Sequence, residues 1–476
     1  LGTCNLKFEF FFMINSLLHC GFLEKNQNLK IGRNFLIGNK KKIKSFKKFS
    51  INNLKNNLEF KKNSNQDTDA KDKFLSWLSY NNVYIFNKST WGRAPHQCFV
   101  SNETTDEGEP CGRGLLAFKK IQQGEKLIEI PENLILSVDR DQIKNEGNDF
   151  LNEYDSLGIF LIQQMAMGDK SKWKIYFDIL PREEDLNLGF RWNLNDIVFL
   201  RGSKTLNASL YLKEKIKIQF LRLEKTIFSK NRLKYPVSIF NLAQWEWALS
   251  ILLSRAIFLQ NLKKVSLVPY ADFMNHNPFS TSYINSKKIS FSKNHEIVMY
   301  ADKDYNKFDQ IFTTYGQKTN LELLLLYGFI LERNPFDSIE LRISLSDKDS
   351  FFEKKKQFMI ECEKTSEITF PIFYYKYPKE LYEFLRFCIS NQEELGSTDL
   401  SDFNFNDENN YEIEKIIRKL VLFSCEKLLK NYSKKVSEEK ILNSLNSNFL
   451  ISKNQKMALK QSKCEKKIIQ RLRNNL

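Results

Sequence analysis

Two segments of β-forming sequence lie far apart in this 476-residue chain, and the stretch between them has helical periodicity. In residues 111–137, short apolar runs alternate with turn residues, and this pattern predicts a β-meander. Residues 148–262 place apolar side chains at helical spacing, whereas β character returns at 266–273, 289–301 and 310–316. Because a helical stretch divides the β segments, we expect them to combine into one α+β unit with a helical insert, not a simple sandwich or barrel.

The clearest helix is predicted from Leu242 to about Gln260, where Asn241 and Gln244 form a capping box. Its buried stripe is expected to consist of Trp245, Ala248, Leu249, Leu252 and Ala256. After about Leu345 the chain becomes helical again. Two helices of this region are marked by residues at helical spacing: Leu381, Phe384, Leu385 and Cys388 in the first, and Ile413, Ile416, Ile417, Leu420 and Ser424 in the second.

Most of the formal net charge of +16 is concentrated near the N-terminus. Residues 25–58 contain ten Lys and Arg and no Asp or Glu, so the rest of the chain carries only +6. Since a nucleic-acid-binding protein usually spreads basic charge over its folded faces, no nucleic-acid partner is expected. No apolar run reaches the roughly 18 residues of a membrane span, so no membrane partner is expected either.

Residues 1–70 are predicted to be a disordered leader, with folded structure starting near Phe74. A short apolar run followed by a basic, acid-free stretch resembles a targeting sequence, and this predicts residence in a plastid. A basic tail without an address is the alternative, with the chain in the cytoplasm or, through Lys40-Lys41-Lys42, in the nucleus.

No metal site is expected from the cysteines and histidines. No two of the eight cysteines lie within four residues of each other, and four histidines are too few for a His-rich site. The cysteine spacing does not resemble a secreted disulfide framework, so a reducing compartment is the simpler interpretation.

Three segments place polar residues or glycines beside apolar runs. Cys111–Gly114 precedes a strand, and its two glycines allow backbone groups to approach a ligand closely, although a plain turn has the same composition. Asp272–Pro278 follows a buried strand and is equally typical of a capped turn. Tyr315-Gly316 and Tyr327-Gly328 lie twelve residues apart, and both pairs are also compatible with the rim of a core.

In this order and spacing, the three segments resemble the SET-domain methyltransferases, in particular the Rubisco large-subunit lysine methyltransferase group. The resemblance extends over about residues 72–472 and rests on the strings GRGLLAFKKIQQGEKLIEIP, WKIYFDILP, LLSRAIF, LVPYADFMNHNP and TTYGQKTNLELLLLYGFILERNP. It implies a knotted SET-domain β-core over residues 71–345, with the helical insert at about 148–262. An all-α substrate-binding domain is then expected over residues 346–476.

The resemblance implies S-adenosylmethionine (SAM) as the cofactor, because the family transfers a methyl group from SAM to a lysine amine. Backbone groups around Gly112 would contact SAM, and Arg255 would face its carboxylate, where a guanidinium fork suits a planar anion. The methionine amine and the adenine would be held at the Asn275–His276 corner. The residues implied as SAM contacts are Cys111, Gly112, Arg113, Arg255, Asn275, His276 and Phe329.

Tyr315 would be the catalytic tyrosine, with its hydroxyl orienting the lysine amine. The amine must be neutral to act as a nucleophile, whereas a free lysine with a pKa near ~10.4 is almost wholly protonated at neutral pH. Burial in a narrow aromatic channel lowers that pKa because it disfavours the charged form. The residues implied near the substrate lysine are Ser254, Asp272, Tyr283 and Tyr327.

Three positions depart from the family pattern. Leu259 stands where the plant Rubisco enzyme has a substrate-contacting arginine, Ile257 stands where it has an aromatic residue, and Phe308 replaces a glycine usual before the catalytic strand. The first departure puts Rubisco in doubt as the substrate without affecting SAM binding.

The sequence thus predicts a monomeric, SAM-dependent protein-lysine N-methyltransferase whose partner is a protein with a target lysine. Two alternatives stay open. One is a protein-histidine N-methyltransferase of the same family, and the other is a non-catalytic SET scaffold whose C-terminal domain binds a partner.

Overall fold

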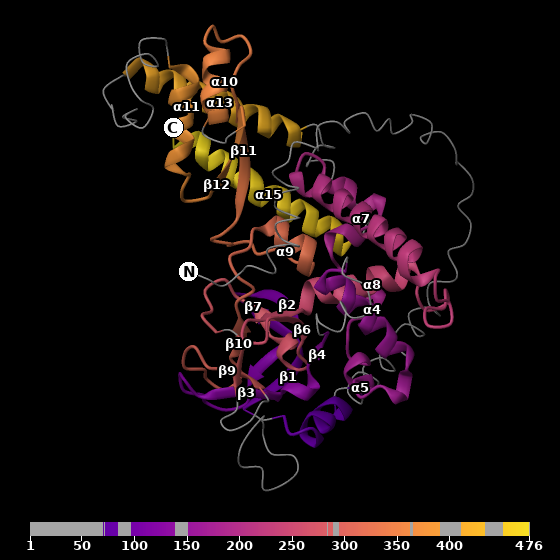
Figure 1. The fold of residues 1–476 in the computed structure, drawn as a ribbon. Coiled ribbons are helices and arrows are strands. Elements are labelled where there is room, and N and C mark those ends of the chain that lie inside the picture. The colour runs from indigo at the N-terminus through magenta and orange to yellow at the C-terminus, as the bar shows by residue number, and fades with distance from the viewer. Residues whose placement is uncertain are drawn as a thin grey trace, which may run out of the picture. The chain divides into compact units, whose positions relative to one another are not determined.

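The computed structural model describes residue 70 and residues 72–83, 97–138, 151–282, 284–288, 295–361, 365–390, 411–433 and 451–475 (Figure 1). The predicted leader, apart from residue 70, lies outside these ranges, and so does Tyr283. The chain divides into two compact units. Unit 1 comprises Leu1–Leu186 and Lys215–Tyr315, and unit 2 comprises Asn187–Glu214 and Gly316–Leu476.

The strands of unit 1 form three small sheets, with the strand orders β1-β2-β10-β7, β3-β9-β8 and β4-β6-β5. Their bounds are β1 Cys98–Asp106, β2 Glu109–Ala117, β3 Lys126–Pro131, β4 Leu136–Ser137, β5 Ile257–Leu259, β6 Lys264–Leu267, β7 Asn275–His276, β8 Asn285–Lys288, β9 His295–Tyr300 and β10 Gln310–Thr313. Each sheet therefore joins strands from both β segments, as the sequence predicted.

The predicted β-meander over residues 111–137 is wrong, because β2, β3 and β4 lie in three different sheets. Each of them pairs with a strand of the second β segment: β2 with β10, β3 with β9 and β4 with β6. Strand β2 also pairs with β1, which precedes it. The connection after β2 explains this arrangement. Ile121 forms a β-bridge with Tyr305, and the Gly124 N–H donates to the Ala301 carbonyl, so the chain is held against the second segment and does not fold back on β2.

The helices of unit 1 are mainly those of the predicted insert, and a short helix at residues 72–80 precedes them. The insert contains α4 (Glu153–Ala166), α5 (Lys174–Phe177), the second part of α7 (Lys204–Leu223), a π-helical turn (Glu224–Phe228) and α8 (Leu242–Arg255). On α8, the Asn241 side chain accepts a hydrogen bond from the Gln244 N–H, which confirms the predicted N-cap. Trp245, Ala248, Leu249 and Leu252 are buried as expected.

The predicted C-terminal end of that helix is wrong. Helix α8 ends at Arg255, because Ala256 adopts an extended backbone conformation with ψ near 140°. The next residues form strand β5, which pairs with β6. The backbone groups of Ile257–Leu259 are thus paired across a sheet. β-Branched and aromatic residues such as Ile257 and Phe258 favour a strand over another helical turn.

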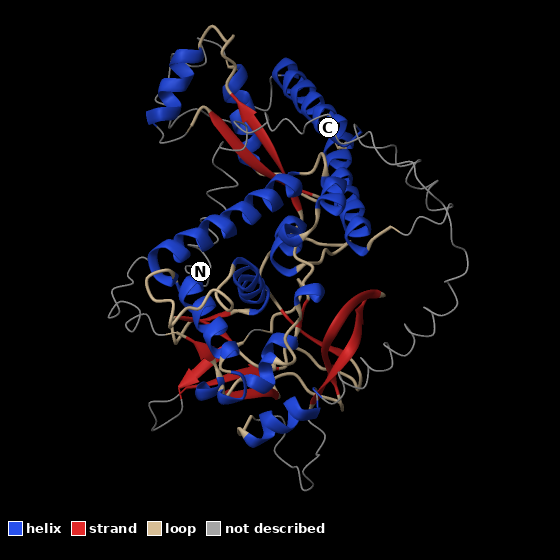
Figure 2. Cartoon of the chain, turned by 90° about the vertical axis from the view of Figure 1, so that its right-hand side faces the viewer, coloured by secondary structure: helices blue, strands red, loops and turns tan. Residues whose placement is uncertain are grey.

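Unit 2 is largely helical, and this confirms the predicted helical C-terminal region. Its elements are α6 (Leu194–Ile197), the first part of α7, α9 (Asn320–Tyr327), β11 (Ser338–Ser344), α10 (Phe352–Glu361), β12 (Glu367–Phe373), α11 (Lys379–Ile389), α13 (Tyr411–Ser433) and α15 (Lys453–Asn474). The sequence analysis did not predict β12, which pairs antiparallel with β11 over its whole length (Figure 2).

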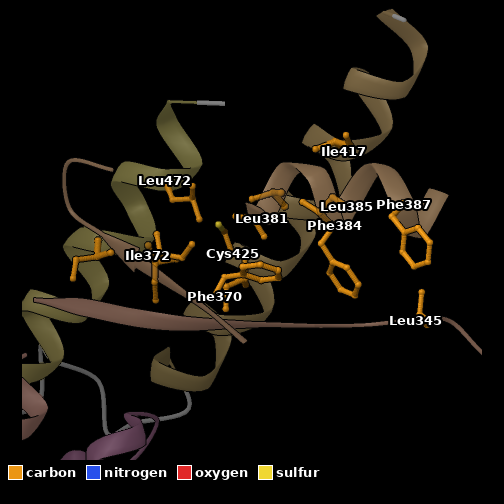
Figure 3. Packing of buried hydrophobic residues seen from close by; sticks show 14 of the residues in the cluster. Leu345, Phe370, Ile372, Leu381, Phe384, Leu385, Phe387, Ile417, Cys425 and Leu472 are labelled. Carbon is orange, nitrogen blue, oxygen red and sulfur yellow. The ribbon is translucent and has the colours of Figure 1, made fainter. Parts of the chain in front are cut away.

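The core of unit 2 lies where α11, α13 and α15 pack on the β11–β12 pair. Side chains such as Phe370 of β12, Leu381 of α11 and Leu472 of α15 point toward one another there (Figure 3). On α13 the predicted stripe is only partly right. Ile417 is buried, whereas Ile416 and Leu420 are 44% and 40% exposed. Apolar residues occur on two faces of α13, so periodicity alone does not identify the face that packs. Among the described helices, none is long and apolar enough to cross a membrane.

Candidate functional site

The predicted catalytic tyrosine and the predicted cofactor corner come together at the parallel pair β7–β10. Asn275 lies opposite Phe312 in this pair and His276 lies opposite Thr313. Two residues beyond β10, the Tyr315 N–H donates to Nδ1 of His276 at 3.0 Å, and the two rings stack with centroids 5.0 Å apart. Residues separated by about forty positions in sequence thus form one corner.

The Tyr315 hydroxyl is fixed by a backbone contact. It donates to the Met274 carbonyl at 2.8 Å, so toward any further group the hydroxyl oxygen acts as an acceptor. His276 is buried, and its Nδ1 accepts a hydrogen bond, which places the ring proton of the neutral imidazole on Nε2.

Asn275 is tied to strand β2 through its side-chain amide. The Nδ2 atom donates to the Arg113 carbonyl and to the Thr104 hydroxyl, both at 3.2 Å. This approach requires a glycine at position 114, because a Cβ atom there would lie 2.6 Å from Nδ2. The second glycine of the Cys111–Gly114 segment therefore makes room for Asn275.

The segment Cys111–Arg113 lies at an irregularity of the β1–β2 pairing. Gly112 has a φ of +72°, and its carbonyl accepts from the Thr104 hydroxyl at 2.8 Å, next to a register shift. Burial raises the pKa of the Cys111 thiol to about 11, so the thiol is neutral. The Arg113 guanidinium donates to the Ile179 carbonyl at 2.8 Å and lies over the Phe273 ring, which fixes this side chain toward the helical insert.

Arg255 and Asp272 contact each other. Nη1 of Arg255 donates to the Asp272 carbonyl at 3.0 Å and to Oδ2 of the same residue at 3.1 Å. The Asp272 side chain is fully buried. Nε of Arg255 and Oδ1 of Asp272 are buried as well, yet neither atom has a hydrogen-bond partner. The pair thus retains one donor and one acceptor that a ligand can satisfy.

Sequence reasoning missed the third member of this group, Tyr176 of α5. Its hydroxyl donates to Oδ2 of Asp272 at 3.0 Å, and the residue is fully buried. Burial, reinforced by the Asp272 charge, raises the pKa of Tyr176 well above its ordinary value, so the hydroxyl stays protonated. Helical spacing marked Tyr176 only as core, and the string WKIYFDILP gave no signal beyond the family resemblance.

The other predicted site residues make contacts that do not indicate a role in binding. The Ser254 hydroxyl donates to the Ser250 carbonyl within α8 at 2.8 Å. Tyr327 and Phe329 belong to unit 2, where Tyr327 is the last residue of α9 and the two rings lie 6.3 Å apart. Within the described ranges, no group of three or more His, Cys, Asp and Glu side chains is arranged to hold a metal ion.

Two of the departures from the family pattern have structural consequences. Phe308 has a φ of +75°, the left-handed conformation that favours the glycine usual at this position. Leu259 is fully buried in β5, so it does not present a side chain to a substrate at the surface.

The sequence matches the SET-domain family over residues 112–316 and the Rubisco LSMT substrate-binding family over residues 346–469. The chloroplastic ribulose-1,5 bisphosphate carboxylase/oxygenase large subunit N-methyltransferase of Nicotiana tabacum is 28% identical over 254 residues, which cover 52% of this chain and 51% of that protein. The chloroplastic [fructose-bisphosphate aldolase]-lysine N-methyltransferase of Arabidopsis thaliana is 28% identical over 277 residues, which cover 56% and 57%. The chain thus spans little more than half the length of these curated relatives.

Among solved structures, the SET domain of LSMT bound to lysine and AdoHcy matches with a TM-score of 0.66 and 25% identity. The match covers 86% of this chain and 91% of that one. It confirms the predicted α+β fold with a SET core and a helical C-terminal domain.

Proposed function

This chain belongs to the SET-domain proteins that carry a Rubisco LSMT substrate-binding domain, and on that premise we propose that it is a SAM-dependent protein-lysine N-methyltransferase. The observation that carries the proposal is the contact of Tyr315 with the Met274–His276 corner. In the proposed division of the chain, the SET domain extends over residues 71–345 and the substrate-binding domain over residues 346–476.

The residues of the corner suit SAM. The unpartnered Nε–H of Arg255 is a donor for a carboxylate such as that of the SAM methionine moiety. Backbone groups at Cys111–Arg113 and the Asn275–His276 corner would complete the contacts. SAM, when bound, supplies an electrophilic methyl group on a sulfonium sulfur.

Tyr315 orients the acceptor amine in this proposal. Because its hydroxyl proton is directed at the Met274 carbonyl, the oxygen can accept a hydrogen bond from the amine and fix the direction of the nitrogen lone pair. Fixing nucleophile and electrophile in line contributes as much as ~7–11 kcal/mol to such a reaction, so positioning carries most of the catalysis. Ser254 and Asp272, both in unit 1, are proposed to lie near the acceptor lysine.

The proposed partner is a protein with an accessible lysine, and the chain is proposed to act as a monomer. The two curated relatives named above differ in their protein substrates, and the buried Leu259 stands where the plant Rubisco enzyme has an arginine. We therefore do not assign Rubisco as the substrate. The chloroplastic relatives support a plastid location, and a fluorescent fusion of residues 13–70 that stays in the cytosol would contradict it.

The test is incubation of the purified protein with SAM labelled in the methyl group and with a plastid or whole-cell extract. We expect label in one or a few protein bands. Calorimetry with S-adenosylhomocysteine accompanies it, because a non-catalytic SET scaffold predicts no transfer and no detectable binding. Absence of both signals would refute the proposal.

A further inference from the structure

The hydrogen bonds around Asp272 are distributed unequally between its two carboxylate oxygens. Oδ2 accepts from both the Tyr176 hydroxyl and Nη1 of Arg255, whereas Oδ1 accepts from no group. An arginine and a carboxylate frequently pair as a fork with two parallel hydrogen bonds. Here the pair has a single side-chain contact, and Nε of Arg255 stays unpartnered although it is buried.

Tyr176 is buried among aromatic rings beside the Arg255–Asp272 pair. The Phe74 ring, from the helix at residues 72–80, lies 6.3 Å from the Tyr176 ring and 5.5 Å from the Phe273 ring. The Phe273 ring in turn carries the Arg113 guanidinium at 4.7 Å. All of these side chains belong to unit 1, and the three aromatic residues are buried.

We propose that Tyr176 is a positioning residue that keeps the Arg255–Asp272 pair in its single-contact geometry and thereby reserves Nε of Arg255 for the carboxylate of the SAM methionine moiety. The proposal rests on the proposed function. The Tyr176 hydroxyl gives Oδ2 a second hydrogen bond, so the carboxylate does not depend on a second N–H from Arg255. Without that hydroxyl, the pair can relax into a two-point fork that consumes Nε.

The inference predicts a loss of affinity that depends on the ligand. S-Adenosylhomocysteine carries the amino-acid carboxylate, whereas its decarboxylated analogue, S-adenosyl-3-thiopropylamine, keeps the adenosine, the sulfur and the amine but lacks that group. In Tyr176→Phe, the Kd for S-adenosylhomocysteine should rise about tenfold, the usual scale for a lost hydrogen bond to a charged group. The Kd for S-adenosyl-3-thiopropylamine should change by less than about twofold. Calorimetry on the full chain measures both.

Two further variants separate positioning from general destabilisation. Tyr305→Phe removes another buried tyrosine hydroxyl bonded to an aspartate, Asp302, and should leave both Kd values unchanged. In an Arg255→Gln background, Tyr176→Phe should have no additional effect on S-adenosylhomocysteine binding, because the group it positions is absent. Should Tyr176→Phe fail to fold, Arg255→Lys, which keeps the charge but lacks the Nε–H, should show the same selective loss, and an unchanged Kd for S-adenosylhomocysteine would overturn the proposal.

The outcomes are distinguishable. Equal weakening of both ligands in Tyr176→Phe, or no weakening of either, would overturn the positioning role while leaving the proposed function intact. A wild-type chain that binds neither ligand would overturn the proposed function and this inference with it.

Discussion

Two buried carboxylates, Asp272 in unit 1 and Glu465 in unit 2, differ in how their oxygens are used. Both oxygens of Glu465 are hydrogen-bonded: Oε1 accepts from Ser203 at 2.7 Å and Oε2 from Tyr432 at 2.8 Å. Asp272 has all its side-chain bonds on Oδ2 and none on Oδ1. Burial alone therefore does not mark a functional carboxylate. The unsatisfied oxygen of Asp272 is available to a ligand, whereas the two satisfied oxygens of Glu465 indicate a structural role.

This comparison makes opposite predictions for the two units. Changes near Asp272 should alter ligand binding or turnover with little effect on stability. Changes near Glu465 should lower stability with little effect on ligand binding or turnover. The following variants test that contrast.

The largest expected effect is on turnover in Tyr315→Phe. Loss of the hydroxyl that orients the amine should reduce methyl transfer by about 10²–10⁴-fold, the range typical of a positioned catalytic side chain. The Kd for S-adenosylhomocysteine should stay nearly the same. Label transfer and calorimetry measure the two quantities, and undiminished transfer would end the assignment of Tyr315.

Glu465→Ala should destabilise the protein without altering the ligand site. The change leaves the Ser203 and Tyr432 hydroxyls buried without their acceptor, and each such group costs ~1–3 kcal/mol. We expect the free energy of unfolding to fall by about 3 kcal/mol in urea titrations. Glu465→Gln, which keeps one acceptor oxygen, is the matched control and should lose less. A higher Kd for S-adenosylhomocysteine at unchanged stability would contradict the structural role of Glu465.

The buried Asp337, near Glu465, should make stability depend on pH. Burial, reinforced by the Glu465 charge, raises the pKa of Asp337 from 3.8 to about 7. Between these values the folded protein holds a proton that the unfolded chain has released. The stabilisation is therefore complete below the unfolded pKa and is lost as pH rises toward 7, by up to about 1.4 kcal/mol per pH unit. Relative to Asp337→Asn, the wild type should lose stability over this range, and parallel pH profiles would contradict the raised pKa.

Gly114→Ala should affect the ligand site by a smaller amount. The added methyl group would lie 2.6 Å from Nδ2 of Asn275, so the amide must move away from the Arg113 carbonyl. Misplacing one hydrogen-bonding group should raise the Kd for S-adenosylhomocysteine about tenfold. The free energy of unfolding should fall by about 1 kcal/mol, the scale of one overpacked methyl group. An unaltered Kd would mean that Asn275 does not contact the cofactor.

The smallest effect is expected at Phe308. Its left-handed backbone costs a non-glycine residue ~1–2 kcal/mol, and Phe308→Gly removes that cost while adding ~0.5–1 kcal/mol of chain entropy. The variant should gain about 0.5 kcal/mol of stability. Phe308→Ala, which keeps the left-handed cost, is the control. Because both variants lack the contact with the Phe99 ring, a larger stability loss in Phe308→Gly than in Phe308→Ala would contradict the backbone cost.

The sequence predicted the parts of the molecule that depend on local patterns. The cap at Asn241 and the helices α11 and α13 follow from capping chemistry and periodicity, and the meeting of Tyr315 with Asn275–His276 follows from the family resemblance. Tyr176 could not be found in this way, because periodicity reports burial and does not distinguish a core tyrosine from one that donates to a carboxylate.

The missed sheet partners have a related cause. Alternation identifies β2, β3 and β4 as strands, but it does not say which distant strand will satisfy their backbone groups. The bridge between Ile121 and Tyr305 decides that pairing, and it joins residues almost two hundred positions apart.

The identity of the methylated residue tests the central claim most directly. After reaction of the wild-type protein with SAM and an extract, tandem mass spectrometry of the labelled substrate reads the modified side chain. The account predicts a methylated lysine ε-amine that is absent when Tyr315→Phe replaces the wild type. A methylated histidine, or the same methylated lysine in both reactions, would contradict it.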